Sequence, residues 1–435
     1  MKTAKFGGSS LADAAQFRRV RSIVERDPSR SVIVVSAPGK RFKEDHKITD
    51  LLYLCSAHLQ YGVACDPVFG MVTERYCAIR DELGLSVDLE SEFKQLRKKM
   101  DDGISQAELV SRGEYFSARL MADYLGYEFV DAADWLRFTL DGAVDRDASY
   151  EALARLATGR RVVIPGFYGV MPDGRIRLMQ RGGSDITGAL AAAALDAEAY
   201  ENWTDVSGIL MADPRIVEEA RSISYITYSE LRELSYIGAQ VLHESSVFPV
   251  REKNIPLNIR NTNDPEDPGT VIRESFENEE DKANRITGIA GRTGFSVVTV
   301  AKSGMSGTSD AFRRVLGYFS KYNVPVAYTT GGIDCYSCVV ESKVLDPYKY
   351  AILAELQREM EPDKIHVSEH LAVLAVVGRR MAFRSGSSAR IFGALAERNV
   401  NIRMISQGPE ELNIIIGVEE KDYREAVRAL YSCCQ

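Results

Sequence analysis

The feature that most constrains the fold is an internal repeat in the last third of the chain. The segment RRVLGYFSKYNVPVAYTTGG at 313–332 aligns without gaps with ARIFGALAERNVNIRMISQG at 389–408, an offset of 76 residues. Each copy has the apolar pattern of a strand, a loop, a helix, two strands and a second helix. We therefore expect two small βαββαβ modules, at residues 285–368 and 369–435, which can be interleaved. Such a duplication suits an effector site, although a purely structural duplication also explains it.

Before the repeat, short apolar runs alternate with amphipathic helical patterns. The runs SVIVVS at 31–36 and RVVI at 161–164 are rich in β-branched residues, as are strands buried on both faces. Before and between these runs, apolar residues recur at helical spacing, at Phe17, Val20 and Val24 and again at Phe116, Leu120 and Tyr124. The alternation predicts an α/β domain at residues 1–280 with a mostly parallel sheet. A stretch rich in charge, Pro and Gly, 264–284, is expected to be an exposed linker.

Composition argues against several classes of protein. Of 435 residues, 45% are hydrophobic and 27% charged, which is typical of a globular chain. Acidic residues outnumber basic ones by 62 to 54, and a net charge of −8 disfavours electrostatic binding of nucleic acid. The sequence contains no run of about 18 apolar residues and no apolar stretch in MKTAKFGGSS at its start. We expect a cytoplasmic protein that binds neither nucleic acid nor a membrane.

The cysteines and histidines do not predict a metal site or a disulfide framework. The seven cysteines are odd in number and unevenly spaced, which fits a reducing compartment. Cys335 and Cys338 have the spacing of a redox or zinc pair, but they lie in a strand-like run and no second pair follows. We interpret them as buried strand cysteines, and we expect no protein-bound metal because the five histidines show no ligand spacing.

Two glycine-rich segments could bind a phosphate or a carboxylate. In KFGGSS at 5–10, a strand that carries Lys5 leads into two glycines, whose backbone amides can approach an anion closely. In QRGGSD at 180–185, Arg181 precedes two glycines, and Ser184 and Asp185 open an alanine-rich helix. An ordinary tight turn explains the first segment equally well, and a helix cap at Ser184 or Asp185 explains part of the second.

Three further segments carry polar residues at the predicted ends of strands and helices. Thr204 and Asp205 follow a strand, at the position where open α/β sheets bind ligands, and Arg215 lies beyond them. Glu114 lies in SRGE, which we expect to start a helix, so that a carboxylate there either stabilises the helix N-terminus or receives an ammonium group. Thr49 is a helix cap or a ligand. Together these groups suit phosphoryl transfer, which depends on positioning and charge neutralisation.

In chain order, these motifs resemble the aspartate kinase branch of the amino acid kinase family. The matching segments are KFGGSS (5–10), VVSAPGK to KITDLL (34–52), SRGE (111–114), GFYG (166–169), QRGGSD (180–185), TDVSGILMADPR (204–215) and GAQVLH (238–243). The repeated tail resembles two ACT domains, and NVNIRMISQG at 399–408 is typical of the second. The resemblance covers nearly the whole chain and implies an amino-acid-kinase-type αβα sandwich followed by two ACT domains.

This resemblance implies transfer of the γ-phosphoryl group of ATP to the β-carboxylate of L-aspartate, which gives 4-phospho-L-aspartate on the route to lysine, threonine and methionine. Lys5 and Asp185 are then the expected catalytic residues, Lys5 at the phosphoryl group in flight. Arg181 suits the α-carboxylate of aspartate and Glu114 suits its ammonium group. The residues expected to bind aspartate are Thr49, Glu114, Arg181 and Ser184.

The cofactor implied by the resemblance is ATP with Mg²⁺, the ion being held by the phosphates rather than by a protein cage. The residues expected to contact the nucleotide are Lys5, Gly7, Gly8, Ser9, Thr204, Asp205, Arg215 and Gln240. The ACT resemblance implies feedback inhibition by lysine or threonine, at Met305, Thr329 and Thr330. ACT modules commonly pair edge to edge, so we expect a homodimer, or a dimer of dimers, through residues 285–435.

Two alternative functions remain open on the sequence. The first is a kinase of another amino-acid carboxylate, such as glutamate or an aspartate analogue, which SRGE, QRGGSD and the ACT pair disfavour. The second is a non-catalytic amino-acid sensor whose kinase site has decayed. The retained Lys5, Glu114, Arg181, Asp185 and Asp205 argue against decay.

The chain departs from the family pattern at three places. Gln240 stands where the GAKVLH motif has a nucleotide-contacting Lys, and Leu210 replaces an aromatic residue that is frequent in relatives. Gly331 and Gly332 follow Thr330 where lysine-sensitive relatives often carry polar side chains. Glutamine supplies no cation, so affinity for the nucleotide is expected to be weaker or differently arranged, and the two glycines leave the identity of the effector open.

The substitution Gln240→Lys tests the missing cation. We expect it to preserve kinase activity and to lower the apparent KM for ATP, because an added ammonium group would attract the phosphates. Steady-state kinetics with ATP as the varied substrate measure this. A large loss of activity would mean that the nucleotide site of this chain is built differently from the family pattern.

Overall fold

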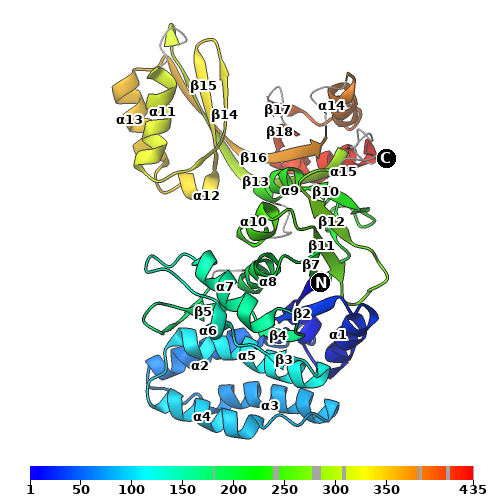
Figure 1. Cartoon of the computed structure of the whole chain (residues 1–435). Coiled ribbons are helices and arrows are strands. Elements are labelled where there is room, and N and C mark those ends of the chain that lie inside the picture. The colour runs from blue at the N-terminus through cyan, green and yellow to red at the C-terminus, as the bar shows by residue number, and fades with distance from the viewer. Residues whose placement is uncertain are drawn as a thin grey trace. The chain divides into compact units, whose positions relative to one another are not determined.

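The structure is a computed structural model that describes residues 1–179, 182–238, 244–276, 286–305, 310–379, 381, 385–407 and 412–434. The chain divides into two compact units (Figure 1). The first unit comprises Met1–Ile209, Ser222–Tyr228 and Val241–Ser275. The second unit comprises Leu210–Arg221, Ser229–Gln240 and Phe276–Gln435.

The first unit is built on an eight-stranded sheet with the order β10-β12-β11-β7-β1-β2-β4-β3. All neighbouring strands are parallel except β11 and β12. The strands are β1 (Lys2–Phe6), β2 (Arg30–Val35), β3 (Glu128–Phe129), β4 (Val162–Pro165), β7 (Ala199–Thr204), β10 (Tyr225–Thr227), β11 (Leu257–Asn261) and β12 (Thr270–Arg273). Short strands outside this sheet are β5 (Tyr168–Val170), β6 (Ile176–Leu178), β8 (Ile209–Leu210) and β9 (Ser222–Ile223).

Helices cover both faces of this sheet. Ile33 and Val35 of β2 pack into the core of α1 to α5, whereas Val32 and Val34 face the core of α6 to α8. Figure 1 shows α2, α3, α4 and α5 gathered on one side. The helices are α1 (Ala14–Arg26), α2 (Ile48–Gln60), α3 (Asp66–Leu83), α4 (Leu89–Asp101), α5 (Gln106–Leu125), α6 (Ala132–Trp135), α7 (Arg146–Ala157), α8 (Gly183–Ala194) and α10 (Glu244–Glu252). The expected sandwich with a mostly parallel sheet is confirmed.

The expected linker at 264–284 is wrong for part of its length. Residues Thr270–Arg273 form β12, which pairs with both β10 and β11. Thr270 and Ile272 are fully buried, because they alternate with outward-facing side chains as in any strand with one face on a core. The surrounding Pro, Gly and acidic residues hid this short apolar pattern in the sequence.

The second unit contains a six-stranded antiparallel sheet with the order β14-β15-β13-β16-β18-β17. Its strands are β13 (Ile286–Ala301), β14 (Val326–Gly332), β15 (Cys335–Glu341), β16 (Lys364–Gly378), β17 (Ile402–Ser406) and β18 (Asn413–Glu419). Its helices are α9 (Tyr228–Ile237), α11 (Asp310–Lys321), α12 (Ser342–Leu345), α13 (Lys349–Met360), α14 (Ser387–Glu397) and α15 (Tyr423–Ser432).

The two longest strands are shared between two modules. The second half of β13 and the first half of β16 complete a module with α11, β14, β15 and α13, and Figure 1 shows α11 and α13 side by side. The other halves of the same strands complete a module with α14, β17, β18 and α15. Each module therefore has the expected βαββαβ composition. The boundaries at residues 280, 285 and 369 stay predictions.

The internal repeat is visible in the backbone. Asn323 and Asn399, which are aligned in the repeat, both have a φ of 54° just after a helix. Their amides donate to Ser320 and Ala396, again an aligned pair. Asparagine is among the few side chains that tolerate this left-handed conformation, so both copies end their helix by the same device.

Several smaller expectations can also be compared with the structure. Cys338 is fully buried and Cys335 is half-buried on β15, and all seven cysteines are free thiols. Within the described ranges, no helix is long and apolar enough to cross a membrane.

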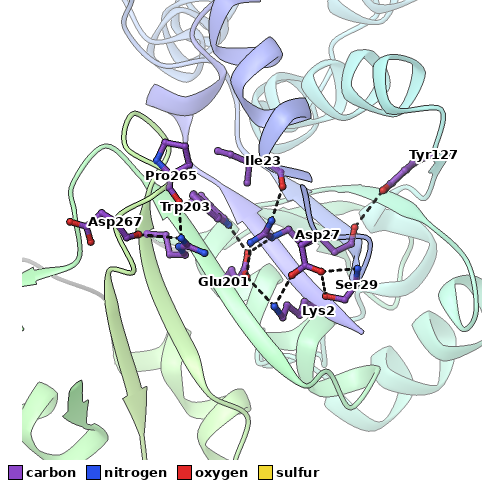
Figure 2. A network of polar contacts seen from close by, with 11 residues as sticks. Lys2, Ile23, Asp27, Ser29, Tyr127, Glu201, Trp203, Pro265 and Asp267 are labelled. Atoms are coloured by element: carbon purple, nitrogen blue, oxygen red, sulfur yellow. Dashed lines mark hydrogen bonds and ion pairs between the residues drawn. The ribbon is translucent and has the colours of Figure 1, made fainter. Parts of the chain in front are cut away.

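A buried polar network fixes β7 to its neighbours on one face of the sheet (Figure 2). Both oxygens of Glu201 accept from Arg30, at 2.6 and 3.1 Å, and Trp203 Nε1 donates to Glu201 at 2.8 Å. Lys2 lies 3.8 Å from the same carboxylate and 2.7 Å from Asp27. The side chains of Arg30 and Glu201 are only 7% and 4% exposed, so each charge depends on the other.

Loss of one partner of this pair should therefore destabilise the first unit strongly. We expect Glu201→Gln to lower the free energy of unfolding by about 3–5 kcal/mol, because it leaves the Arg30 guanidinium buried without a counter-charge. The chain has two tryptophans, Trp135 and Trp203, and both are buried in the first unit, so tryptophan fluorescence in a urea titration follows that unit.

The matched control is Glu82→Gln. Glu82 pairs with Arg18 at 2.9 Å, but these side chains are 59% and 49% exposed. Solvent screens such a pair, so the change should stay within about 0.5 kcal/mol. Equal effects of the two substitutions would contradict a stabilising role for the buried network.

Candidate active site

Lys5 lies in the middle of the sheet and points to the face covered by α8. Its strand, β1, lies between β2 and β7, and Lys5 is level with Asn202 of β7. Lys5 Nζ lies 2.6 Å from Asp185 Oδ1, and the same oxygen accepts from Asn202 Nδ2 at 3.0 Å. Lys5 is 7% exposed, so its charge is compensated by Asp185. The two expected catalytic residues are thus in direct contact.

The turn after β1 holds its backbone close to that of a second loop. Gly39 donates its amide to the Gly8 carbonyl at 2.7 Å. A Cβ on Gly8 would lie 2.8 Å from the Ala37 carbonyl oxygen, and a Cβ on Gly39 would lie 2.8 Å from the Gly8 carbonyl carbon. Only glycines allow this approach. The Gly7 amide donates to Trp203 O at 3.0 Å, so the turn also stays beside the end of β7.

The N-terminus of α8 places Ser184 and Asp185 in its first turn. The helix cap is Gly182, with a φ of 77° and no side-chain hydrogen bond, so the interpretation of Ser184 or Asp185 as the cap is wrong. Ser184 is buried against Gly166, where a Cβ would approach its side chain to 2.6 Å. An acidic group in this turn favours the helix and remains available to Lys5.

Phe167 has a strained backbone next to this helix. Its φ is 78°, a conformation that a bulky side chain rarely adopts. Its amide donates to Thr187 Oγ1 at 3.1 Å, and its carbonyl accepts from the Met179 amide at 2.8 Å. Its ring takes the space that a Cβ on Gly183 would need. These contacts hold the strained residue beside the first turn of α8, and strain of this kind concentrates at functional sites.

Glu114 is a buried carboxylate with one oxygen unused. It is 4% exposed; Oε1 accepts from the Ala37 amide at 3.2 Å, whereas Oε2 is buried without a hydrogen-bond partner. Burial raises the pKa of Glu114 to about 8, and the positive charges of Arg112 and Lys5 only partly oppose this shift. The site therefore offers a buried acceptor that a cationic ligand would satisfy.

The expectation that SRGE starts a helix is wrong. Glu114 lies in the third turn of α5, which begins at Gln106. The cap is Ser105, whose hydroxyl accepts from the Glu108 amide at 3.2 Å. The sequence did contain the signal, because Ser105 and Glu108 have the spacing of a capping box. A first-turn role for Glu114 is therefore excluded.

Thr49 lies in the first turn of α2 and is not its cap. The cap position is Lys47, which makes no side-chain capping bond. Gly113, the neighbour of Glu114, contacts Ile48 and Ala37 so closely that a Cβ would lie 3.7 and 2.9 Å from their side chains. Thr49 is half-buried, and its helix packs against α5, which carries Glu114.

The expected nucleotide ligands are distributed over both units. Thr204 ends β7 and donates to the exposed Asp205 at 3.1 Å. Ser9 is half-buried in the 3-10 turn Gly8–Leu11. Arg215 belongs to the second unit, where Asp213 binds its guanidinium at 2.7 Å. Arg181 and Gln240 lie outside the described residues.

The expected effector residues lie in the second unit. Met305 is buried in the core of the first βαββαβ module together with Val298 and Val315. Thr329 is exposed and Thr330 is half-buried, both on β14. In the part of the chain that the structure describes, no group of three His, Cys, Asp or Glu side chains could hold a metal ion.

Sequence reasoning missed Asn202, Gly39 and Gly166. Asn202 precedes the Thr204–Asp205 motif, and its place on a strand level with Lys5 would have marked it. Gly39 and Gly166 matter through close approaches to Gly8 and Ser184 that only the fold reveals.

Comparisons with known proteins agree with this geometry. The model of the amino acid kinase family matches residues 3–261, and an ACT domain model matches residues 374–433. Aspartokinase 3 of Bacillus subtilis is 35% identical over 99% of this chain and 98% of its own length. A bifunctional aspartokinase/homoserine dehydrogenase of Haemophilus influenzae is 30% identical over 99% of this chain, which spans 56% of that protein.

Solved structures give the same result. The aspartate kinase of Clostridium acetobutylicum is 43% identical, covers 100% of this chain and 99% of its own, and superposes with a TM-score of 0.91. Escherichia coli aspartokinase III in complex with aspartate and ADP is 26% identical, with coverage of 100% and 99% and a TM-score of 0.75. With family models over most of the sequence and full-length relatives above 30% identity, the chain belongs to the aspartokinases of the amino acid kinase family.

Proposed function

We propose that this protein transfers the γ-phosphoryl group of ATP to the β-carboxylate of L-aspartate and so forms 4-phospho-L-aspartate. The observation that carries the proposal is the ion pair between the buried Lys5 and the half-buried Asp185, 2.6 Å apart at the centre of the sheet. A buried ammonium group next to a glycine turn neutralises charge on a phosphoryl group during its transfer. Asp185 holds that ammonium group in place until the phosphates arrive, and Asn202 donates to the same oxygen of Asp185.

The backbone of the two loops that carry Gly8 and Gly39 supports the same step. Gly7, Gly8 and Ser9 are proposed to line the path of the phosphates, and the close approach of Gly8 to Gly39 keeps the amides of Gly8 and Ser9 in fixed positions. Fixed donors need no reorganisation as negative charge develops on the transferred group. Lys5 then adds a full positive charge on the same path.

The acceptor amino acid is proposed to bind around Glu114. Its buried, unpartnered Oε2 suits the ammonium group of aspartate. Thr49 and Ser184 provide hydroxyls for the carboxylates, and Arg181 provides a guanidinium for the α-carboxylate. An amino acid held by both of its ends presents its β-carboxylate to the phosphoryl group in one orientation, which lowers the entropic part of the barrier.

The nucleotide is proposed to be ATP bound with Mg²⁺, in contact with Thr204, Asp205, Arg215 and Gln240. Mg²⁺ would enter on the phosphates and neutralise part of their charge. Asp205 is exposed at the carboxyl end of β7, where an open parallel sheet binds its ligands.

Regulation is proposed to act through the second unit. The effector is an amino acid, lysine or threonine, at Met305, Thr329 and Thr330, and the protein is proposed to be a cytoplasmic homodimer or dimer of dimers joined by its βαββαβ modules. Two edge strands, β14 and β17, end the six-stranded sheet and offer unpaired backbone groups for such an association. For comparison, Escherichia coli aspartokinase III has been solved with lysine and aspartate.

Removal of the Lys5 charge tests the transfer step. We expect Lys5→Ala to lower kcat by about 10²–10³-fold, because the developing charge loses its main counter-charge. A coupled assay of ADP release, with aspartate, glutamate or neither, measures this, and only aspartate should support turnover by the wild type.

The matched control is Lys2→Ala on the same strand. Lys2 pairs with Asp27 at 2.7 Å, on the side of strand β1 opposite to Lys5, and its removal should not affect kcat. Wild-type activity in Lys5→Ala would remove Lys5 from the mechanism. Release of ADP with glutamate alone would favour another carboxylate kinase, and no release with any acceptor would favour a sensor.

The raised pKa of Glu114 predicts a pH dependence for aspartate binding. The ionised form binds an ammonium group, so kcat/KM for aspartate should rise with pH up to about pH 8 and then level off. Glu114→Gln should remove this rise and increase the KM for aspartate, whereas Glu108→Gln on the same helix should do neither, because Glu108 pairs with Lys99 at the surface.

The free energy of unfolding should fall as the pH rises, whereas kcat/KM for aspartate should increase. The pKa of Glu114 is raised by burial from its usual 4.5, so the folded state favours the protonated form. The contribution of Glu114 to the free energy of unfolding is fully present below pH 4.5 and is lost as the pH rises towards about 8. Glu114→Gln should lose less stability than the wild type over this range in urea titrations, and parallel curves would contradict the assignment.

Feedback inhibition is tested by titration of lysine and threonine, singly and together, into the same assay. We expect an amino acid to reduce activity and Thr330→Ala to weaken that effect. Because Gly331 and Gly332 add no side chain to this region, the inhibition constant should be sensitive to Thr330. No response to either amino acid would contradict regulation in this form.

A further inference from the structure

Helix α3 buries a charged residue among apolar neighbours. Arg75 is 6% exposed and lies between Val72 and Ile79, at a position that the helical pattern assigns to the core. Burial of a guanidinium is costly unless its donors are satisfied. The proposed mechanism assigns Arg75 no role, so its burial calls for a separate account.

The donors of Arg75 reach two loops of the chain. Nη2 donates to both oxygens of Asp45, at 2.9 and 2.7 Å. Nη1 donates to the carbonyl oxygens of Gly39 at 3.1 Å and Ala12 at 3.3 Å. Asp45 is itself 6% exposed and also accepts from the backbone and side chain of Arg41. One guanidinium thus joins the loop after β1 to the loop after β2.

Both carbonyls belong to loops of the proposed active site. The amide of Gly39 donates to the Gly8 carbonyl, and the carbonyl of the same Gly39 accepts from Arg75. Ala12 ends the segment that contains the turn Gly8–Leu11. Ala37, two residues before Gly39, donates to Glu114. Arg75 therefore binds a carbonyl in each of two loops. One loop carries Gly8 on the proposed path of the phosphates, and the other carries Ala37, which contacts Glu114 at the proposed amino-acid site.

The next residue of α3 strengthens this arrangement. Tyr76 is fully buried, and its hydroxyl donates to the Gly113 carbonyl at 2.5 Å, directly before Glu114. Successive residues of one helix thus hold the two glycine loops and the carboxylate helix α5. Supporting contacts of this kind keep reacting groups in register.

We infer that Arg75 and Asp45 form a positioning pair for the phosphoryl transfer, which sets the glycine loop after Lys5 relative to the loop that supports Glu114. The inference rests on the proposed function, because those loops bind the phosphates and the amino acid. Arg75 touches neither substrate and acts through the carbonyls of Ala12 and Gly39. A displacement of about 1 Å between reacting groups can reduce the rate by about 100-fold.

The structure provides a matched control at Arg30. That guanidinium is equally buried, binds both oxygens of Glu201 and donates to one carbonyl, that of Ile23. Its carbonyl partner lies in α1, away from the glycine loops. Arg30→Lys and Arg75→Lys therefore remove the same kind of buried contacts, but only the second removes direct contacts with the two loops of the site.

The test compares these two variants in the full-length protein. Hydrogen exchange measured by mass spectrometry reports on the peptides that cover residues 7–13 and 36–46, and ADP release with aspartate reports on activity. We expect Arg75→Lys to speed exchange in both peptides by about tenfold, since charged hydrogen bonds are lost. It should lower kcat about 10–100-fold, whereas Arg30→Lys should change kcat and the exchange of these peptides much less, because Arg30 has no direct contact with either loop.

Tryptophan fluorescence shows whether each variant is folded. Equal kcat and equal exchange in folded Arg75→Lys and Arg30→Lys would overturn the inference. If Arg75→Lys does not fold, Asp45→Asn takes its place, and wild-type exchange and kcat in that variant would overturn it. An inactive wild type would refute the proposed function alone, since the exchange measurement judges the positioning pair without turnover.

Discussion

The ion pair between Lys5 and Asp185 is the interaction around which the first unit is arranged. It brings together the central strand β1 and the first turn of α8, which are far apart in the sequence. Asn202 on β7 completes the contact from the next strand. An unpaired ammonium group at this depth would be strongly disfavoured, so the pair fixes the positions of all three elements. The charge that suits phosphoryl transfer is thus kept inside the protein by the fold itself.

A second constraint is the burial of Glu114 with an unused oxygen. An ionised carboxylate is costly there, which is why its pKa rises to about 8. A cationic ligand that pairs with it recovers part of this cost. In the proposed binding mode, the ammonium group of aspartate replaces the proton of Glu114. The chain's net charge of −8 adds nothing favourable for two anionic substrates. Positively charged side chains in the site must therefore attract both substrates.

Local features of the site could be predicted from the sequence, and contacts between distant segments could not. The strand and glycine turn around Lys5 are encoded by adjacent residues. The internal repeat predicted both βαββαβ modules. The start of α5 was misplaced because the capping box at Ser105 was overlooked, and β12 was hidden in a charged stretch. Asn202 and Arg75 escaped notice because their roles come from strand register and helix packing, which bring together residues distant in the chain.

The central claim is that a carboxylate is phosphorylated, and the acyl phosphate itself can be trapped. Hydroxylamine converts an acyl phosphate into a hydroxamate, which mass spectrometry identifies. With ATP, Mg²⁺ and L-aspartate, we expect the β-hydroxamate of aspartate to form in a one-to-one ratio with ADP, and none to form when aspartate is omitted. Release of ADP without the hydroxamate, or a hydroxamate at the α-carboxylate, would contradict the account.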